Sequence, residues 1–291
     1  MPDIVTFVQE LLTAAFRVWT APVSLVRYAA VAAMLAIWFA VRKRRDGRWP
    51  SLATRDAATD GLYTAFYLGG IYAFFIALPL FAVMTALVRN FAPTLQINLL
   101  RGLPVIAQVI VVSLVMDFMA YWWHRWVHGS SFLWAFHSIH HSQTELTPLT
   151  NYRFHFVDMI TRSLVQLVPA VILGPAPAIL LAAVFLETAL NALAHADAGW
   201  SFGPAGRLIV SPQFHRVHHS TEQAHLRSNF GLTYSLWDHL FRTANHAAGR
   251  PAAYGVEEKV PRGFFAQLLH PLRTIARRPG TEASLGAAPL T

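Results

Sequence analysis

Long apolar stretches alternate with short polar segments along this chain of 291 residues. The apolar stretches are residues 22–41, 61–88, 103–123, 159–173 and 177–194. A helix of about 20 apolar residues crosses the hydrocarbon core of a membrane, and the last two stretches meet at a Gly-Pro turn that predicts a hairpin. The pattern therefore predicts an all-α fold, an integral membrane helical bundle of about four to five membrane helices in hairpins.

The polar segments between these stretches indicate the orientation of the bundle. Residues 42–48, RKRRDGR, form the strongest basic run, and the positive-inside rule places such a run in the cytoplasm. Counting spans from there brings His124 to the cytoplasmic side, and the later hairpin returns His195 to the same side. We therefore expect a helical, His-rich metal-binding cap on the cytoplasmic side. Residues 4–20 predict an amphipathic interfacial helix, and the tail after Arg277 predicts disorder.

The composition favours a membrane protein. Hydrophobic residues make up 55% and charged residues 13% of the chain, against about 25% charged residues in soluble domains. The net charge is +8, but the basic residues lie where a membrane protein needs them, so we expect no nucleic acid partner. Abundant alanine and arginine favour a bacterial source, and hence the inner (cytoplasmic) membrane. The chain has no cysteine, which excludes a thiolate ligand or an iron–sulfur cluster.

Fourteen histidines stand out against this apolar background. Positions three or four apart share one face of a helix, and neutral imidazole binds iron, zinc, copper or nickel. Three groups have that spacing: His124 and His128; His137, His140 and His141; and His215, His218 and His219. Because a catalytic zinc ion typically uses three protein ligands, eight such histidines predict two metal ions with four or five ligands each.

Local signals place the three groups on separate helices. Gly129 ends one helix and Ser130 can cap the next. Ser211 followed by Pro212 is typical of a helix start, and it precedes the third group. His195 stands at the cytoplasmic end of the hairpin, and we predict that it is a further ligand.

Several polar residues are predicted to support the ligand rings. Asp117 lies two turns before His124 on the same helix face, where its carboxylate can accept a ring N–H and fix the tautomer. Asn191, His155 and Asp238 are further candidates for this role. The remaining histidines have no partner at helical spacing and are predicted to lie at the surface or in support: His225, His239, His246 and His270.

Longer motifs surround these histidines. They read D-x-x-x-Y-x-x-H-R-x-x-H at 117–128, W-x-F-H-x-x-H-H-S at 134–142 and F-H-R-V-H-H-S at 214–220, followed by Asn229 with Gly231, Trp237-Asp238 and Leu240-Phe241. This set resembles the fatty acid hydroxylase/sterol desaturase superfamily of integral membrane di-iron oxygenases. Two segments depart from it: RFHFVD at 153–158 stands where R-F-H-P-L-E is usual, and FRT at 241–243 where F-G-T is common.

The resemblance implies an enzyme that uses two iron ions and O2 to hydroxylate or desaturate an unactivated C–H bond of a membrane lipid. The catalytic iron ligands that it implies are His124, His128, His137, His140, His141, His195, His215, His218 and His219. Fatty acyl, sterol-like, carotenoid, ether and amino lipids all remain open as substrates. Since the sequence has no haem segment, flavin motif or cysteine cluster, we expect a separate electron donor: a ferredoxin, cytochrome b5 or a reductase.

Two other functions compete with this interpretation. A His-rich membrane metal transporter or binding protein would carry its ligands within the spans, whereas these histidines lie at the span ends. A zinc-dependent membrane hydrolase would carry an HExxH helix, whereas Arg125 follows His124. The predicted division of the chain is residues 1–101 for N-terminal membrane helices and the basic loop, 102–245 for the di-iron domain, and 246–291 for a C-terminal cytoplasmic segment.

Overall fold

The computed structural model describes residues 22–47, 49–50, 54–72, 75–76, 79–80, 83 and 99–276. The α-helices with defined bounds are α2 (Pro22–Asp46), α3 (Arg55–Leu68), α5 (Val105–Gly129), α6 (Ser131–His141), α7 (Phe156–Leu173), α8 (Pro177–Ala194), α9 (Pro212–His218), α10 (Leu236–Leu240) and α11 (Phe264–Ala276). The 3-10 helices are η3 (Pro148–Tyr152), η4 (Gly203–Arg207) and η5 (Gln223–His225). These residues form no β-strand, which confirms the predicted all-α fold for the described part of the chain.

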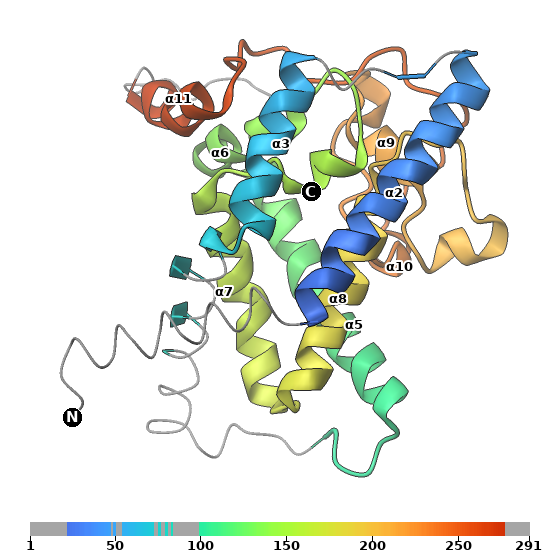
Figure 1. Cartoon of the computed structure of the whole chain (residues 1–291), viewed down its shortest axis with the longest axis vertical. Coiled ribbons are helices and arrows are strands. Elements are labelled where there is room, and N and C mark those ends of the chain that lie inside the picture. The colour runs from blue at the N-terminus through green and yellow to red at the C-terminus, as the bar shows by residue number, and fades with distance from the viewer. Residues whose placement is uncertain are drawn as a thin grey trace.

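Helices α5, α7 and α8 form the elongated part of the molecule, and α5 packs against both arms of the α7–α8 hairpin (Figure 1). The hairpin turn has a local cause. Gly174 ends α7 in the left-handed region, at φ 59°, where a residue without a Cβ is favoured. Pro177 then occupies the first turn of α8, where its missing N–H costs no hydrogen bond. The predicted hairpin around residues 174–177 is therefore present.

Apolar side chains cover much of the outside of this elongated part. Exposed examples are Val105, Ile106, Ile110, Leu164, Val168 and Leu181. Among the described residues, α5 is the one helix that is long and apolar enough to cross a membrane, and Ala178–Ala194 is a shorter apolar helix. The predicted number of about four to five membrane helices is therefore not confirmed.

The apolar stretch at residues 61–88 differs from the predicted span. Helix α3 begins before it, at Arg55, and ends within it, at Leu68. Gly69 and Gly70 follow, and Gly70 has a φ of +83°. The stretch therefore does not begin a single long helix at residue 61, and most of its remainder lies outside the described residues. The predicted interfacial helix at residues 4–20 and the predicted disordered tail after Arg277 also lie outside them.

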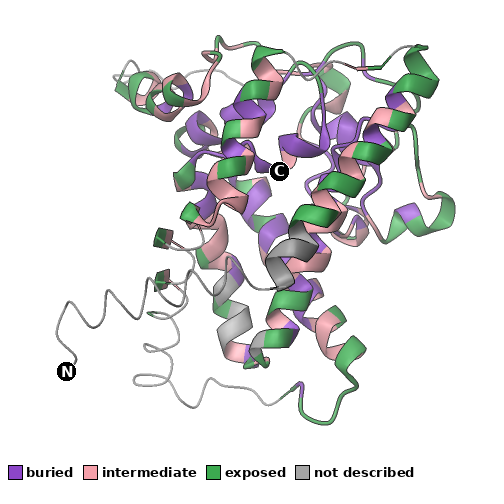
Figure 2. Ribbon diagram, in the orientation of Figure 1, coloured by how far each residue is buried: buried purple, intermediate pink, exposed green. Residues whose placement is uncertain are grey.

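The nine histidines that the sequence predicts to bind metal lie in a cap region, which we define as residues 124–155 and 195–245. Buried residues concentrate around α6, α9 and the adjoining end of α5 (Figure 2). Polar contacts tie the N-terminal helices to this region. The guanidinium of Arg153, which is 1% exposed, pairs with the carboxylate of Asp60 in α3. At the end of α2, Arg42 and Arg45 both pair with Asp197.

Candidate metal centre

The nine predicted ligands come from four helix ends that meet in the cap region. His124 and His128 lie in the last turns of α5, and α6 carries His137, His140 and His141. His195 follows the last residue of α8, and α9 supplies His215, His218 and the residue after its end, His219. The two predicted N-caps are present. Ser130 Oγ accepts the N–H of Leu133 at 3.3 Å, and Ser211 Oγ accepts the N–H of Phe214 at 3.2 Å.

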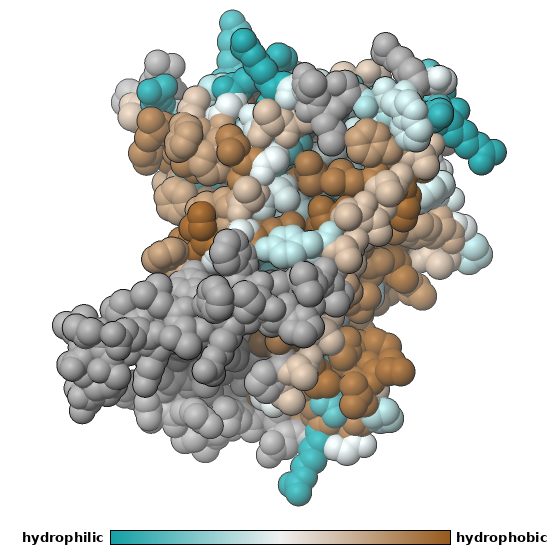
Figure 3. Space-filling model, viewed as in Figure 1, coloured by the Kyte–Doolittle hydropathy of each residue, from teal (hydrophilic) through white to brown (hydrophobic). Residues whose placement is uncertain are grey.

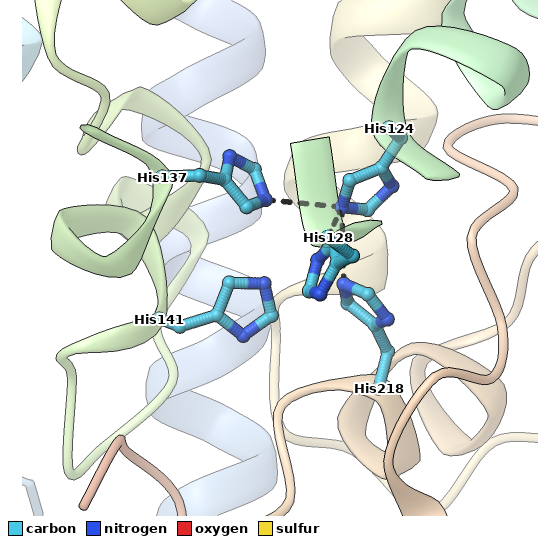
Figure 4. A group of neighbouring side chains, drawn as sticks. All are labelled: His124, His128, His137, His141 and His218. Carbon is cyan, nitrogen blue, oxygen red and sulfur yellow. Dashed lines mark hydrogen bonds between the residues drawn. The ribbon is translucent and has the colours of Figure 1, made fainter. Parts of the chain in front are cut away.

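The nine histidines form two adjoining groups. One contains His124, His128, His137, His141 and His218, and the other contains His140, His195, His215 and His219. Within each group, one ring nitrogen of every residue lies within 4.8 Å of the others. Figure 4 shows the five-histidine group, whose rings from α5, α6 and α9 point toward a common centre.

Ring nitrogens within each group approach one another closely. His124 Nε2 lies 3.1 Å from His137 Nε2, 3.2 Å from His128 Nε2 and 3.1 Å from His218 Nε2. Separations of 2.9 to 3.4 Å recur in the four-histidine group. Two nitrogens that bind one metal ion at ~2.1 Å, with an angle between about 90° and 109°, lie about 3.0–3.4 Å apart. The spacing therefore fits ligands that share an ion.

Hydrogen bonds at the opposite ring nitrogens leave no proton between the Nε2 atoms of His124 and His137. His124 Nδ1 donates to the main-chain oxygen of Phe230 at 2.8 Å, and His137 Nδ1 donates to Asp158 Oδ2 at 2.8 Å. A neutral imidazole has one N–H, so each Nε2 carries a lone pair. Two lone pairs then face each other across 3.1 Å. Such an arrangement is repulsive unless a cation lies between them.

The same arrangement recurs in both groups. His140 donates to the main-chain oxygen of Arg153, His195 to that of Asn191, and His218 to that of Ser228. Three further ring nitrogens are buried without a hydrogen-bond partner: His141 Nε2, His215 Nδ1 and His219 Nδ1. Buried polar atoms are normally satisfied. The donor set, which consists of imidazole nitrogens in both groups, is compatible with a transition-metal site.

Burial favours the neutral form of six of these imidazoles. It lowers the pKa of His195 to about 4 and that of His218 to about 3. The pKa values of four more rings are lowered by burial first and by a neighbouring histidine second: His140, His141, His215 and His219. Because the neutral ring is the form that binds a metal ion, this environment keeps the ligands ready at neutral pH.

Asp158 supports a ligand, and the sequence analysis did not single it out. It is 2% exposed, and its carboxylate accepts the Nδ1 hydrogen of His137. A carboxylate behind a metal-binding histidine fixes the ring and raises its basicity. The signal was in the RFHFVD segment, where Asp158 stands at the position of the superfamily's usual glutamate.

Asp117 contacts a loop, whereas the sequence predicted a histidine ring. Its carboxylate accepts the main-chain N–H groups of Thr233 and Tyr234, at 2.9 and 3.0 Å, and the indole N–H of Trp237 at 3.1 Å. The prediction of a direct bond to a ring is therefore wrong, because residues 230–237 fold back onto α5 and take up the carboxylate. Asp117 acts on the site through this loop.

Asp238 supports the same loop from its other side. Its carboxylate accepts the N–H groups of Phe230 and Gly231, at 2.8 and 2.7 Å, and the hydroxyl of Thr243. Phe230 in turn supplies the main-chain oxygen that holds His124. Asp238 therefore orients a ligand through one intervening residue.

Of Asn191 and His155, only Asn191 contacts one of the grouped histidines. Asn191 contacts His195 through its main-chain oxygen, while its side chain donates to the oxygen of Glu187. His155 belongs to neither histidine group. It precedes α7, where Nδ1 accepts the N–H of Val157, and its Nε2 donates to the main-chain oxygen of Leu268 in α11. His155 thus joins two helices and does not hold a ligand ring.

A cleft of about 310 Å³ reaches the five-histidine group. His128, His141 and His218 line it, and Trp134 lies beside them. Polar side chains that include Arg227 and Glu257 line the rest. No member of the four-histidine group lines this cleft. The five-histidine group is therefore the one that the cleft opens to the outside.

Comparison with known proteins agrees with this geometry. Residues 109–243 match the family model described as Fatty acid hydroxylase. The chain contains a fatty acid hydroxylase domain. The domain includes all nine histidines and the loop that supports His124, and it ends at Thr243, whose hydroxyl donates to Asp238. The resemblance inferred from the histidine motifs is confirmed.

Curated relatives of this fatty acid hydroxylase domain act in lipid chemistry, as their names state. An ornithine lipid hydroxylase of Rhizobium tropici is 31% identical over 177 residues, which cover 60% of this chain and 53% of that protein. An alkylglycerol monooxygenase of Caenorhabditis elegans is 29% identical, over 44% of this chain and 25% of that protein. A very-long-chain aldehyde decarbonylase of Oryza sativa subsp. indica is 24% identical, over 46% of this chain and 22% of that protein.

The chain thus spans about half the length of the first relative and a quarter or less of the other two. No solved structure is significantly similar to it.

Proposed function

We propose that this protein is a membrane-bound oxygenase that uses O2 to hydroxylate or desaturate an unactivated C–H bond of a lipid. The observation that carries the proposal is the convergence of nine imidazoles into two adjoining groups inside a fatty acid hydroxylase domain. Relatives with this domain are named as a lipid hydroxylase and a monooxygenase. Those names support oxidation of a lipid.

The metals in this proposal are two iron ions, one in each histidine group. Imidazole suits iron, and each group offers at least four ring nitrogens. When bound, iron supplies the redox chemistry with O2 that side chains lack. Hydroxylation would balance as R–H + O2 + 2e⁻ + 2H⁺ → R–OH + H2O. Desaturation would need the same O2, electrons and protons, and would release two molecules of water.

The chain's own residues would orient and protect the reaction. Main-chain oxygens and Asp158 hold five of the nine rings at Nδ1, so that each Nε2 points into its group. Burial keeps bulk water from the rings, which limits side reactions. The cleft beside Trp134 would admit O2 or part of the substrate to the five-histidine group.

We infer that the protein lies in the bacterial inner membrane, with the histidines on the cytoplasmic side. The apolar length of α5 and the exposed apolar side chains around the hairpin support membrane insertion. The last turn of α2 carries Lys43, Arg44 and Arg45, and it lies at the same end of the molecule as the cap region (Figure 1). That location agrees with the positive-inside rule.

The substrate and the electron donor belong to the same proposal. An amino lipid is the first class to test, because one relative that matches 60% of this chain is named an ornithine lipid hydroxylase. Fatty acyl, sterol-like and other lipids are the next classes. The electrons would come from a separate protein: a ferredoxin, cytochrome b5 or a reductase.

Metal analysis tests the proposal. The detergent-purified protein, from cells grown on iron-57, should contain about two irons per chain, with a coupled diferric Mössbauer signal. His140→Ala and His219→Ala should lose metal while remaining in the membrane. His239→Ala is the matched control, because His239 lies outside both groups and contacts His246. One zinc ion or no metal, after growth with ample iron, would favour a hydrolase or a transport protein.

Lipid analysis tests the reaction. The lipids of a deletion strain should lack one oxygenated or unsaturated species. Expression of the native chain should restore that species, and the restoration is carried out under ¹⁸O2. Hydroxylation would add one labelled oxygen to the lipid, and desaturation would remove two hydrogens and add none. An unchanged lipid profile with a protein that contains two irons would reject the lipid substrate and retain the metal centre.

A further inference from the structure

Helix α11 presents an apolar face to the outside of the molecule. Phe265 is 77% exposed, Leu269 49% and Leu272 61%. These residues are four and three positions apart, so they lie along one side of the helix. Gln267 and Pro271 are buried on another side. The helix therefore has an inner face that packs on the protein and an outer apolar face that the described residues leave exposed.

The inner face is held firmly, which fixes the direction of the outer face. Helix α11 packs against α6 and α3. The ring of Phe264 lies 4.7 Å from that of Tyr63 in α3, edge to face. The main-chain oxygen of Leu268 accepts the Nε2 hydrogen of His155 at 3.2 Å. These contacts join α11 to α3 and to the residue before α7. A rotation of α11 that hid its apolar face would therefore break them.

Further apolar side chains are exposed at the starts of α6 and α7. Phe132 at the start of α6 and Phe156 at the start of α7 are also exposed. Ring contacts through Phe136 and His155 connect these two residues. Helix α11 lies across the direction of α5, α7 and α8 (Figure 1). Figure 3 shows hydrophobic surface across the width of this face, below a hydrophilic edge.

Exposed positive charges flank the apolar face. Arg262 lies just before α11 and Arg273 lies in its last turn. No acidic residue occurs within the helix. An apolar face with basic residues at its borders is typical of helices that lie in the headgroup layer of an anionic membrane.

We propose that α11 lies in the cytoplasmic headgroup layer, with Phe265, Leu269 and Leu272 inserted toward the acyl chains and with anionic lipid beside its arginines. This inference rests on the membrane location in the proposed function and on none of its redox chemistry. It gives α11 a role in the site as well. The helix packs on α6, which carries three of the ligands, so the membrane surface would support the metal-binding helix directly.

Spin labels test the location of α11. The chain has no cysteine, so Leu269→Cys, Leu272→Cys and Glu257→Cys each give one attachment point in the full chain, reconstituted in vesicles with phosphatidylglycerol. Glu257 is the control, because it is exposed and lines the polar cleft. The ratio of the collision rate with apolar O2 to that with chromium oxalate should be severalfold higher for the labels at residues 269 and 272 than for the label at residue 257.

Other results would overturn the proposal. Frequent collision of all three labels with chromium oxalate would place α11 in water. Shielding from both reagents would indicate a protein on the apolar face. A short distance between labels on two chains would then identify a second copy of the chain as that protein. If removal of residues 277–291 restored the collision rates of the labels, the chain's own tail would be identified instead. Iron content, measured on the same samples, separates any of these results from failure of the oxygenase proposal.

The arginines provide an independent test of the lipid. Arg262→Gln with Arg273→Gln should reduce the preference of the label at 269 for O2 in anionic vesicles and leave it unchanged in phosphatidylcholine vesicles. If the protein with both native arginines gave the same ratio of O2 to chromium oxalate collisions in anionic and in phosphatidylcholine vesicles, anionic lipid would be rejected as the partner.

Discussion

The rings of His141 and His219 stack with their centroids 4.4 Å apart and their planes at 26°, although each belongs to a different histidine group. Each follows another ligand directly, His140 and His218 respectively. Neighbouring residues on a helix point about 100° apart. Each His-His pair therefore contributes one ring to each of the two groups, and the two pairs keep the groups side by side.

The unequal size of the groups predicts unequal sensitivity to mutation. His195→Ala would leave three histidines in its group, whereas His128→Ala would leave four in the larger one. We expect His195→Ala to lose more metal per chain than His128→Ala, because one imidazole is a larger share of a four-ligand set than of a five-ligand set. The metal-to-protein ratio measures this, with His239→Ala as the control. Equal losses in both variants would argue against two separate ions.

Asp158→Asn should weaken metal binding without removing a ligand. The amide cannot supply the charge that stabilises the Nδ1 hydrogen of His137. Substitutions behind metal ligands typically cost about 10–100-fold in affinity. Competition with a chelator would measure that loss, and Glu257→Gln is the control for removing a carboxylate near the cleft. Unchanged affinity would show that Asp158 does not tune the site.

Gly231→Ala should destabilise the loop that supports His124. A Cβ there would lie 2.6 Å from the oxygen of Tyr234 and 2.7 Å from Asp238 Oδ2. The loop must shift to relieve this, at a cost of about 1–3 kcal/mol in the free energy of unfolding. Thermal unfolding in detergent would detect it. Gly61→Ala is the comparison, because a Cβ at Gly61 has no neighbour within 4 Å. Equal stability of the two variants would contradict this packing.

Acid should destabilise the metal-free protein before it protonates the folded site. Below pH ~6.5 an unfolded chain takes up a proton at each histidine, whereas folded His195 and His218 have pKa values of about 4 and about 3. The unfolded state then binds more protons, so the free energy of unfolding falls as the pH falls. At pH 5 each residue would account for about 2 kcal/mol.

Chemical unfolding at pH 7.5, 6 and 5 would measure this loss. His218→Gln should make the decline shallower by its own share. A stability that does not change between pH 7.5 and 5 would mean that the folded rings take up protons as readily as the unfolded ones.

Local sequence signals were sufficient for much of the fold and for the nine histidines that converge in two groups. Ser130 and Ser211 cap the helices that they were predicted to cap, because capping depends on residues within one turn. Helix α8 has the predicted bounds, from Pro177 to Ala194. The nine histidines could be chosen from fourteen because helical spacing and the motifs separate them from the rest.

Contacts between distant segments were not predictable in the same way. The assignment of His140 and His141 to different groups depends on the orientation of α6 about its own axis relative to α9. Asp117 was expected to hold a ring on its own helix, and it instead accepts N–H groups more than a hundred residues away in sequence. The role of His155 depends on α11, a helix that the sequence analysis did not identify.

The support of His124 by Phe230 also sets an order of events during synthesis. The two residues are 106 positions apart, and the N–H of Asn229 is held by the oxygen of Thr243 further along. In the proposed membrane protein, α5 would leave the ribosome and enter the bilayer before the segment that orients His124 is synthesised. Under the proposed function, metal loading would therefore follow membrane insertion, and a chain that stalls before residue 243 would lack the segment that completes the centre.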